Sequence, residues 1–241
     1  MRIRLPVGRT IFFLGTFFLA LVALLPMRLA LDWFGVGNRG VAAREVQGSV
    51  WFGALKEAQV GNVGLGDLNA RLRALPLLLG QARISLVRDD GAPADDLRGA
   101  ATVTRNGFGF DDVTGRLQLT AGALGPLPLS QIDLSDVTAR FENGLCIEAA
   151  GTVRAMVAGD VGGIALPAGL TGTARCDAGA LLLAMASQSS LETVELRMFG
   201  DGRYVANVLI RSTDAALRDR MGAAGLTLTP QGYGMNVNGQ F

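Results

Sequence analysis

Residues 46–60, VQGSVWFGALKEAQV, alternate in polarity with a period of two, and this stretch decides the fold class. Positions of even number are mostly apolar or glycine, while Gln47 and Ser49 fall between them. Successive side chains of a strand point to opposite faces of a sheet, so the pattern is typical of a strand with one buried and one solvated face. The alternation runs on to Val60.

The same alternation recurs through most of the chain. The further stretches are 68–74, 82–86, 113–119, 137–141, 145–149, 153–157, 204–210 and 233–237. The turn signals that separate such stretches are Asn62, Asp89-Asp90-Gly91, Asn106-Gly107, Asn143-Gly144, Gly162-Gly163 and Asp201-Gly202. The sequence therefore predicts a mainly β body, a mostly antiparallel, twisted sheet shaped as a groove or a sandwich.

Three segments depart from the strand pattern. Residues 214–221 are the best helix candidate in the body, because apolar residues recur there four apart and a glycine follows. Residues 75–79 contain Pro76, which cannot donate in a ladder, and are expected to be a turn or an edge segment. Residues 181–190 are expected to form a short strand followed by a loop.

A different pattern occupies the N-terminus. Residues 11–27, IFFLGTFFLALVALLPM, form an unbroken apolar run behind Arg2, Arg4 and Arg9. A helix of that length rises about 25 Å, enough to span a thin bilayer. The positive-inside rule then places a leader, 1–9, in the cytoplasm, a single transmembrane helix at 10–31, and the body on the other side.

Two other interpretations of the apolar run remain. A cleaved signal peptide has an apolar region of about 7–15 residues and a small-x-small cleavage site. Here the run is longer, and residues 26–31 offer no convincing site. A buried core helix is the second alternative. No other long apolar stretch follows, so the sequence supports one span.

Composition excludes several classes of function. The 22 basic and 21 acidic residues nearly cancel, so nothing indicates a nucleic-acid partner. The chain has no histidine, the commonest general base and metal ligand, and two cysteines alone cannot build a usual zinc site. The carboxylate pairs are Asp89-Asp90, Asp95-Asp96 and Asp111-Asp112. They lie in polar, turn-like segments and are expected to be solvated loop charges. We expect no catalytic, cofactor-binding or metal site and no enzyme.

Cys146 and Cys176 are the only cysteines, and an even count beyond the membrane predicts a disulfide. Opposed residues of an antiparallel hairpin share a constant sum of residue numbers, here 322, which centres the hairpin on Val161 within a glycine-rich turn signal. This register sets Gly151 against Thr171. The alternatives are two free buried cysteines or a redox-active pair, although CxxC spacing is absent.

Residues 124–129, LGPLPL, are the most rigid break in the chain, because two prolines fix φ and remove two donors. They divide the body into an N-terminal half, 32–123, and a C-terminal half, 130–241. Composition does not change across the break, so we expect one continuous sheet.

A characteristic order of parts runs through the chain. The parts are a basic leader with one span, GSVWFGAL at 48–55, LPL at 127–129 with IDL at 132–134, two cysteines about thirty residues apart, and a glycine-rich strand at the C-terminus. In this order the chain resembles the protein N (GspN) family of the bacterial type II secretion system. The resemblance implies a single-pass accessory subunit of the inner membrane with a periplasmic body. Such a subunit is a non-enzymatic scaffold that contacts other secretion subunits during export of folded proteins.

A second resemblance points elsewhere. The GSVWFGAL stretch and the succession of strands also look like AsmA-type proteins, which are anchored by one helix and present long β-grooves to lipid. A groove of that kind needs a continuous apolar inner face. The alternating residues could supply such a face, or they could pack within an ordinary sandwich.

Overall fold

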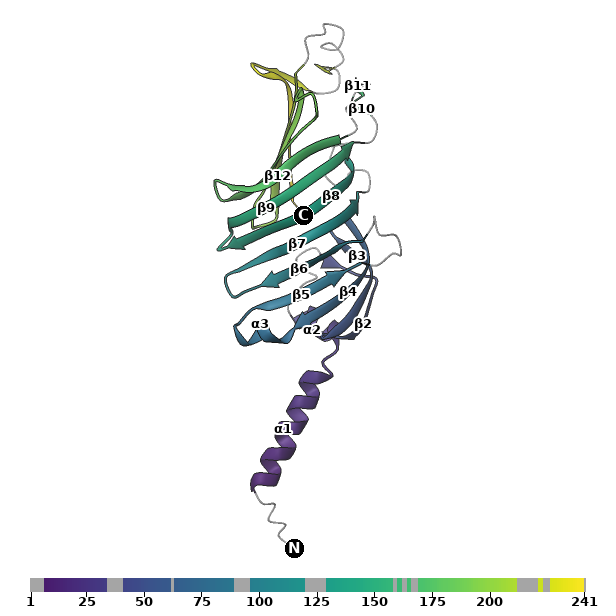
Figure 1. The fold of residues 1–241 in the computed structure, drawn as a ribbon, viewed down its shortest axis with the longest axis vertical. Coiled ribbons are helices and arrows are strands. Elements are labelled where there is room, and N and C mark those ends of the chain that lie inside the picture. Colours follow the sequence, from purple (N-terminus) through teal and green to yellow (C-terminus); the bar gives the residue numbers. More distant parts are fainter. Residues whose placement is uncertain are drawn as a thin grey trace.

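A single open sheet of 15 strands forms the body of the protein (Figure 1). The computed structural model describes residues 7–33, 41–61, 63–88, 96–119, 129–157, 160–161, 164–165, 169–211, 221–222 and 226–240. The helices are α1 (Val7–Ala23), α2 (Met27–Trp33) and α3 (Ala74–Leu78). The strands of the N-terminal half are β1 (Val41–Ala42), β2 (Glu45–Ser49), β3 (Phe52–Val60), β4 (Val63–Arg73), β5 (Ala82–Val87), β6 (Arg98–Val103) and β7 (Gly107–Gln118).

The C-terminal half continues the same sheet. Its strands are β8 (Leu129–Glu142), β9 (Leu145–Val157), β10 (Asp160–Val161), β11 (Ile164–Ala165), β12 (Gly169–Asp177), β13 (Ala180–Ala186), β14 (Glu192–Met198), β15 (Arg203–Ile210), β16 (Thr227–Thr229) and β17 (Gly232–Gln240). The strand order is β1-β3-β4-β5-β6-β7-β8-β9-β12-β13-β14-β15-β17-β16, with β2 beside β3 and β10-β11 as a separate ladder. The prediction of a mainly antiparallel β body is therefore confirmed.

The proline-rich segment does not divide the sheet. β7 pairs with β8 from Gly107 and Glu142 to Gln118 and Gln131, so strands from both sides of the segment are neighbours. Leu129 opens β8, while residues 124–128 lie outside the described part of the chain.

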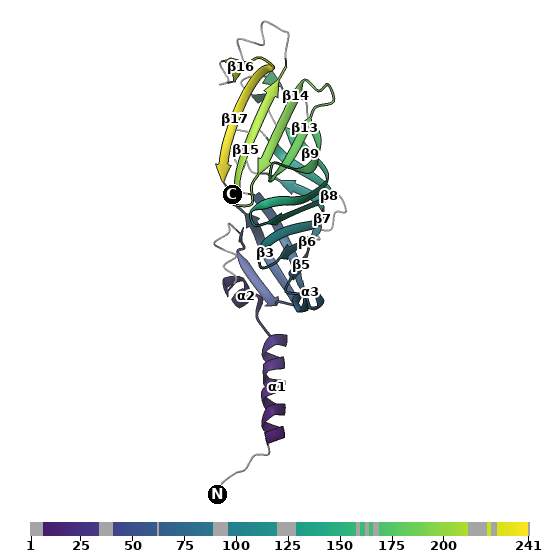
Figure 2. The same ribbon diagram turned by 90° about the vertical axis from the view of Figure 1, so that its left-hand side faces the viewer.

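The two faces of the C-terminal strands differ in polarity. Leu183, Leu196, Ala206 and Val237 lie side by side on β13, β14, β15 and β17, and all four are buried in one cluster. The opposite face of β15 and β17 carries polar side chains; the Asn236 amide there donates to Asn207 Oδ1 at 2.7 Å. This cluster also contains residues of β8 and β9, so the sheet wraps around its own apolar face. Figure 1 shows β5 to β9 crossing the long axis obliquely, whereas Figure 2 shows β13 to β17 running nearly along it.

β-bulges supply this curvature. Extra residues interrupt the register of β3, β7 and β8, and Glu57, Asp112 and Asp136 occupy them with positive φ angles. A bulge adds local twist but leaves a backbone N–H without its ladder partner. In all three cases a side chain of the neighbouring strand accepts that N–H. The acceptors are Asp67 Oδ1 for Glu57 (2.9 Å), Thr138 Oγ1 for Asp112 (3.2 Å) and Thr114 Oγ1 for Asp136 (3.0 Å).

One glycine faces the bulge of β8, and another lies at a register shift within β7. Gly151 has φ +109°, and a Cβ built on it would lie 2.6 Å from the carbonyl oxygen of Asp136 in the bulge of β8. Gly115 has φ +146°, and its Cβ would lie 2.6 Å from Leu97 Cα. Only glycine allows neighbouring backbones to approach this closely. The bulges and these glycines together form a crease across β6 to β9.

The N-terminal half has its own core, which α2 completes. Met27 is 5% exposed and packs with Leu55, Leu68 and Leu97 on the inner face of the sheet. A Cβ on Gly53 would lie 2.0 Å from Met27 Sδ, so the helix approaches the backbone of β3 closely. α2 is therefore part of the body.

Three local predictions are wrong. Residues 46–60 are not one strand: β2 and β3 form a hairpin that pairs Ser49 with Phe52, because the alternation continues through its two-residue turn. Residues 75–79 fall largely in α3, since Pro76 is tolerated in the first turn of a helix. The proposed span 10–31 is broken after Ala23: Pro26 has no N–H and disfavours helix at Leu25, so α1 ends before it.

The remaining local predictions concern residues 181–190, 233–237 and 214–221. Residues 181–190 form strand β13 followed by a turn, as expected. Residues 233–237 lie in β17, paired to β15 and β16. The helix predicted at 214–221 lies almost wholly outside the described residues. Within the described part of the chain, no helix is both long and apolar enough to cross a membrane.

Candidate functional site

Backbone hydrogen bonds hold the junction between α1 and the sheet. Beyond Ala23 the chain turns, and Pro26 forms a β-bridge with Ser49 of β2. The backbone N–H of Val50 donates to the carbonyl of Leu25 at 3.1 Å. The chain that leaves α1 is thus bonded to the β2–β3 turn, which fixes where the helix meets the body.

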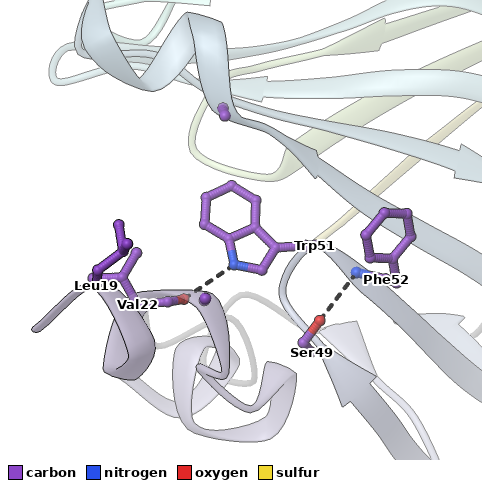
Figure 3. A pocket seen from close by; sticks show the side chains of 7 residues that line it. Leu19, Val22, Ser49, Trp51 and Phe52 are labelled. Carbon is purple, nitrogen blue, oxygen red and sulfur yellow. Dashed lines mark hydrogen bonds between the residues drawn. The ribbon is translucent and has the colours of Figure 1, made fainter. Parts of the chain in front are cut away.

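Trp51 extends this contact to the last turn of α1. The final carbonyls of a helix lack intrahelical partners. The Trp51 indole Nε1–H donates to one of them, the carbonyl of Val22, at 3.0 Å (Figure 3). An apolar recess of about 410 Å³ lies at this junction. Its lining residues are Leu19, Val22, Ala23, Ser49, Trp51, Phe52 and Ala74.

Exposed apolar side chains surround the junction. Phe52 is 70% exposed, and Leu75, Leu78 and Leu79 at α3 are exposed to a similar degree. α3 lies at the end of the sheet from which α1 leaves, as both orientations show (Figures 1 and 2). This surface was not predicted from the sequence, although the run of four leucines around one proline at 75–79 was a visible signal.

Asp111 is the centre of a charged cluster on the sheet. The Arg140 Nη2 atom lies 2.9 Å from Asp111 Oδ1, and Arg83 Nη1 lies 3.3 Å from Oδ2. Thr102 Oγ1 also donates to Oδ2, at 2.9 Å. Burial raises the pKa of Asp111, but the hydrogen bonds from Arg140 and Thr102 and the charge of Arg83 outweigh it, so its pKa lies below the ordinary value.

The predicted role of the acid pairs is partly wrong. Asp111 and Asp112 are not loop charges: both lie within β7, and the Asp111 side chain is only 5% exposed. Two adjacent carboxylates are typical of a solvated loop, whereas here Asp111 pairs with arginines of β5 and β8. Asp89, Asp90 and Asp95 lie outside the described residues. Among the residues that are described, no group of three or more acidic, cysteine or histidine side chains could hold a metal ion.

Cys146 and Cys176 form a disulfide between β9 and β12, with Cα atoms 5.5 Å apart. The register predicted from them is wrong. Thr171 faces Arg154 instead of Gly151, and the residue numbers of the β9–β12 pairs add to 325. The β10–β11 pairs have the same sum, so the hairpin is centred between Val161 and Ile164. The backbone N–H of Cys146 donates to the carbonyl of Gly179 at 2.8 Å, a pair whose residue numbers also add to 325.

The body as a whole matches a known family. The family model described as type II secretion system (T2SS), protein N, matches residues 39–239. The chain belongs to this family. Comparison with curated proteins gave no match, and comparison with solved structures gave none either.

Membership of the T2SS protein N family has direct consequences. It confirms the family resemblance seen in the sequence, and it implies that the protein takes part in type II secretion. The family is an accessory component of the secretion system, which suggests association with the cell envelope and with other subunits of the machinery. The match begins after α2, so it covers the whole sheet and leaves out α1.

Proposed function

We propose that this protein is a non-enzymatic scaffold of the type II secretion machinery, anchored in the inner membrane by α1 with its body in the periplasm. The observation that carries the proposal is the family match over residues 39–239, which spans the entire sheet. The shape of that sheet suits a scaffold, because one continuous ladder from β1 to β17 connects distant surfaces through hydrogen-bonded strands.

The anchor is supported by the surface of α1. Its aromatic and aliphatic side chains are exposed around the helix, among them Phe12, Phe13, Phe17 and Phe18. A helix that is apolar all round is suited to lipid and not to water. Arg2, Arg4 and Arg9 precede or open it, which favours a cytoplasmic N-terminus.

Topology reporters test the anchor. A periplasm-dependent reporter fused after Gly48 should be active, and the mature protein should keep its original N-terminus. Recovery of a soluble form that starts near residue 30 would show instead that the segment is a cleaved signal.

Secretion itself tests the role of the protein. Deleting the gene should cause folded substrates of the type II system to accumulate in the periplasm, and the full-length chain supplied in trans should restore their release. A catalytic subunit would lose function on substitution of one reactive side chain. A scaffold should tolerate single substitutions of exposed carboxylates such as Glu148. Normal secretion by the deletion strain would count against the proposal.

The lipid-groove alternative receives no support from the apolar face of the C-terminal strands. Leu183, Met185, Val194 and Leu196 are buried against one another and against β8 and β9. The protein's own side chains therefore cover this face, where a lipid chain would need open space.

A further inference from the structure

We propose that the end of the body from which α1 leaves inserts into the bilayer surface, so that a second, monotopic contact holds the sheet against the membrane. The contact surface is the basal patch, defined as Trp51, Phe52, Leu75, Leu78 and Leu79. This inference builds on the proposed anchor and adds a lipid-binding surface that lies in the body itself.

The exposure of the basal patch is the first argument. Leu78 is 83% exposed, and Leu75, Leu79 and Phe52 are nearly as open. Large apolar side chains gathered on one surface of a protein mark a site for a protein or membrane partner, whereas single exposed leucines need no explanation. α3 has no buried residue, so its leucines are not explained by packing within the body.

The position of the patch selects the partner. Leu19 and Val22 of α1, Trp51 and Phe52 of the β2–β3 hairpin, and Ala74 of α3 line one recess. The patch is thus continuous with the exposed apolar surface of the proposed anchor and lies at the end of the sheet from which α1 leaves (Figures 1 and 3). A bilayer that surrounds α1 reaches the patch without any movement of the body.

The length of α1 gives an independent reason for insertion. From Val7 to Ala23 it has 17 residues. This corresponds to about 25 Å, against about 30 Å for the hydrocarbon core of a bilayer. A short span is accommodated when the bilayer thins or when flanking residues enter it. Since hydrogen bonds tie Trp51 to Val22 of α1 and Val50 to Leu25 just beyond the helix, the patch enters with α1.

The chemistry of the rim fits a bilayer surface. Trp51 presents an apolar ring beside a bonded N–H, the type of side chain enriched at membrane interfaces. Arg71 and Arg73 lie at the end of β4, just before α3, and are exposed. The Arg71 guanidinium lies 5.5 Å from the centre of the Phe52 ring. When the basal patch is inserted, basic side chains beside it meet the phosphates of the lipid headgroups.

Fluorescent labelling of the full-length protein in vesicles tests the proposal. The native cysteines form a disulfide and do not react with a thiol label, so Leu78→Cys can carry a single environment-sensitive fluorophore. Leu75→Cys is a second reporter. Leu228→Cys is the matched control, because Leu228 is 73% exposed and lies on β16 at the other end of the sheet (Figure 2). The vesicles contain only phosphatidylethanolamine and phosphatidylglycerol, with or without brominated chains.

We expect a blue-shifted emission at positions 75 and 78, and quenching by brominated lipid several-fold stronger than at position 228. Equal, water-like emission at all three positions in protein that floats with the vesicles would overturn the basal patch and leave the anchor intact. It would point to another protein subunit as the partner. Protein that fails to float would overturn the anchor and the patch together. None of these results depends on secretion, so the proposed role in secretion is tested separately.

Discussion

Asp111 illustrates how one side chain can tie several strands together. It lies on β7, yet its carboxylate is bonded to Thr102 of β6 and Arg140 of β8 and is paired with Arg83 of β5. A buried carboxylate is tolerated only when its oxygens are paired. The cluster therefore fixes the register of four strands next to the crease.

Replacing Asp111 with asparagine should destabilise the body by about 1–3 kcal/mol, because the two arginines lose a charged acceptor in a buried place. Denaturation in urea at neutral pH measures the loss. Asp201→Asn is the matched control: Asp201 also binds an arginine, Arg203, but on the surface. Equal effects of the two substitutions would show that burial of Asp111 does not matter.

The ion pairs of Asp111 also make the stability of the protein depend on pH. The pKa of Asp111 is lower in the folded protein than its ordinary value of about 3.9. Its contribution to stability is therefore complete above pH ~4 and is lost as the pH falls through the folded pKa. Between pH 5 and pH 2, the stability of Asp111→Asn should fall less than that of the unaltered protein.

The disulfide is the other residue-scale constraint. Cys146 and Cys176 close a loop with a sequence separation of 30, so the bond should contribute about 3–4 kcal/mol by restricting the unfolded chain. The double substitution Cys146→Ala/Cys176→Ala should lower the urea midpoint without removing an activity. Thiol labelling of the unfolded, unreduced protein should find no reactive thiol. Two labelled cysteines would refute the bond in solution.

At the scale of elements, the crease across β6 to β9 decides the shape of the sheet. Gly151→Ala should destabilise the protein by about 2–3 kcal/mol or more, because the new Cβ meets the backbone of Asp136 and Val137 and φ is positive. Gly64→Ala on β4 is the control, since nothing lies within 4 Å of its Cβ. Thermal melting compares the two. A Gly151→Ala protein as stable as Gly64→Ala would mean that the crease relaxes freely.

β17 is the element that completes the C-terminal sheet. It makes eight residue pairs with β15, and Val237 is buried in the main core. Removing residues 233–241 should abolish folding or strongly lower the melting temperature, because β15 becomes an edge and the core loses Val237. Asn238→Ala, at an exposed position of the same strand, should leave melting unchanged. A truncated protein with the normal melting curve would show that β17 is dispensable.

The sequence predicted elements better than their registers. Alternation reveals strands because the side-chain period of two is set by strand geometry itself. Bulges and turns break that simple count. Alternation passed unbroken through the turn of the β2–β3 hairpin. The predicted β9–β12 register differs by three in the sum of residue numbers, because it assumed that the bridged cysteines oppose each other in the ladder. The extra residues at Glu57, Asp112 and Asp136 have no local sequence signal, because the acceptors that satisfy them come from the neighbouring strands.

At the scale of the whole molecule, the site was only partly predictable. The apolar run and the arginines before it indicated an anchor, and Pro26 shows where α1 has to end. The contact between Trp51 and Val22 joins residues 29 apart, so no local pattern could reveal it. The apolar surface of α3 belongs to the site because it lies beside α1. That position depends on the folded sheet and could not be predicted from the local sequence.

The central claim is that the body is a scaffold that contacts other subunits of the type II system in the periplasm. Site-specific photo-crosslinking in cells tests it most directly, with a crosslinker placed in turn at exposed positions such as Leu145, Leu191 and Leu228. We predict that one or more positions give adducts whose second component, identified by mass spectrometry, is a type II secretion subunit, and that adducts disappear when the machinery is not expressed. Adducts that contain no secretion subunit at any position, in cells where the protein is folded and abundant, would contradict the account.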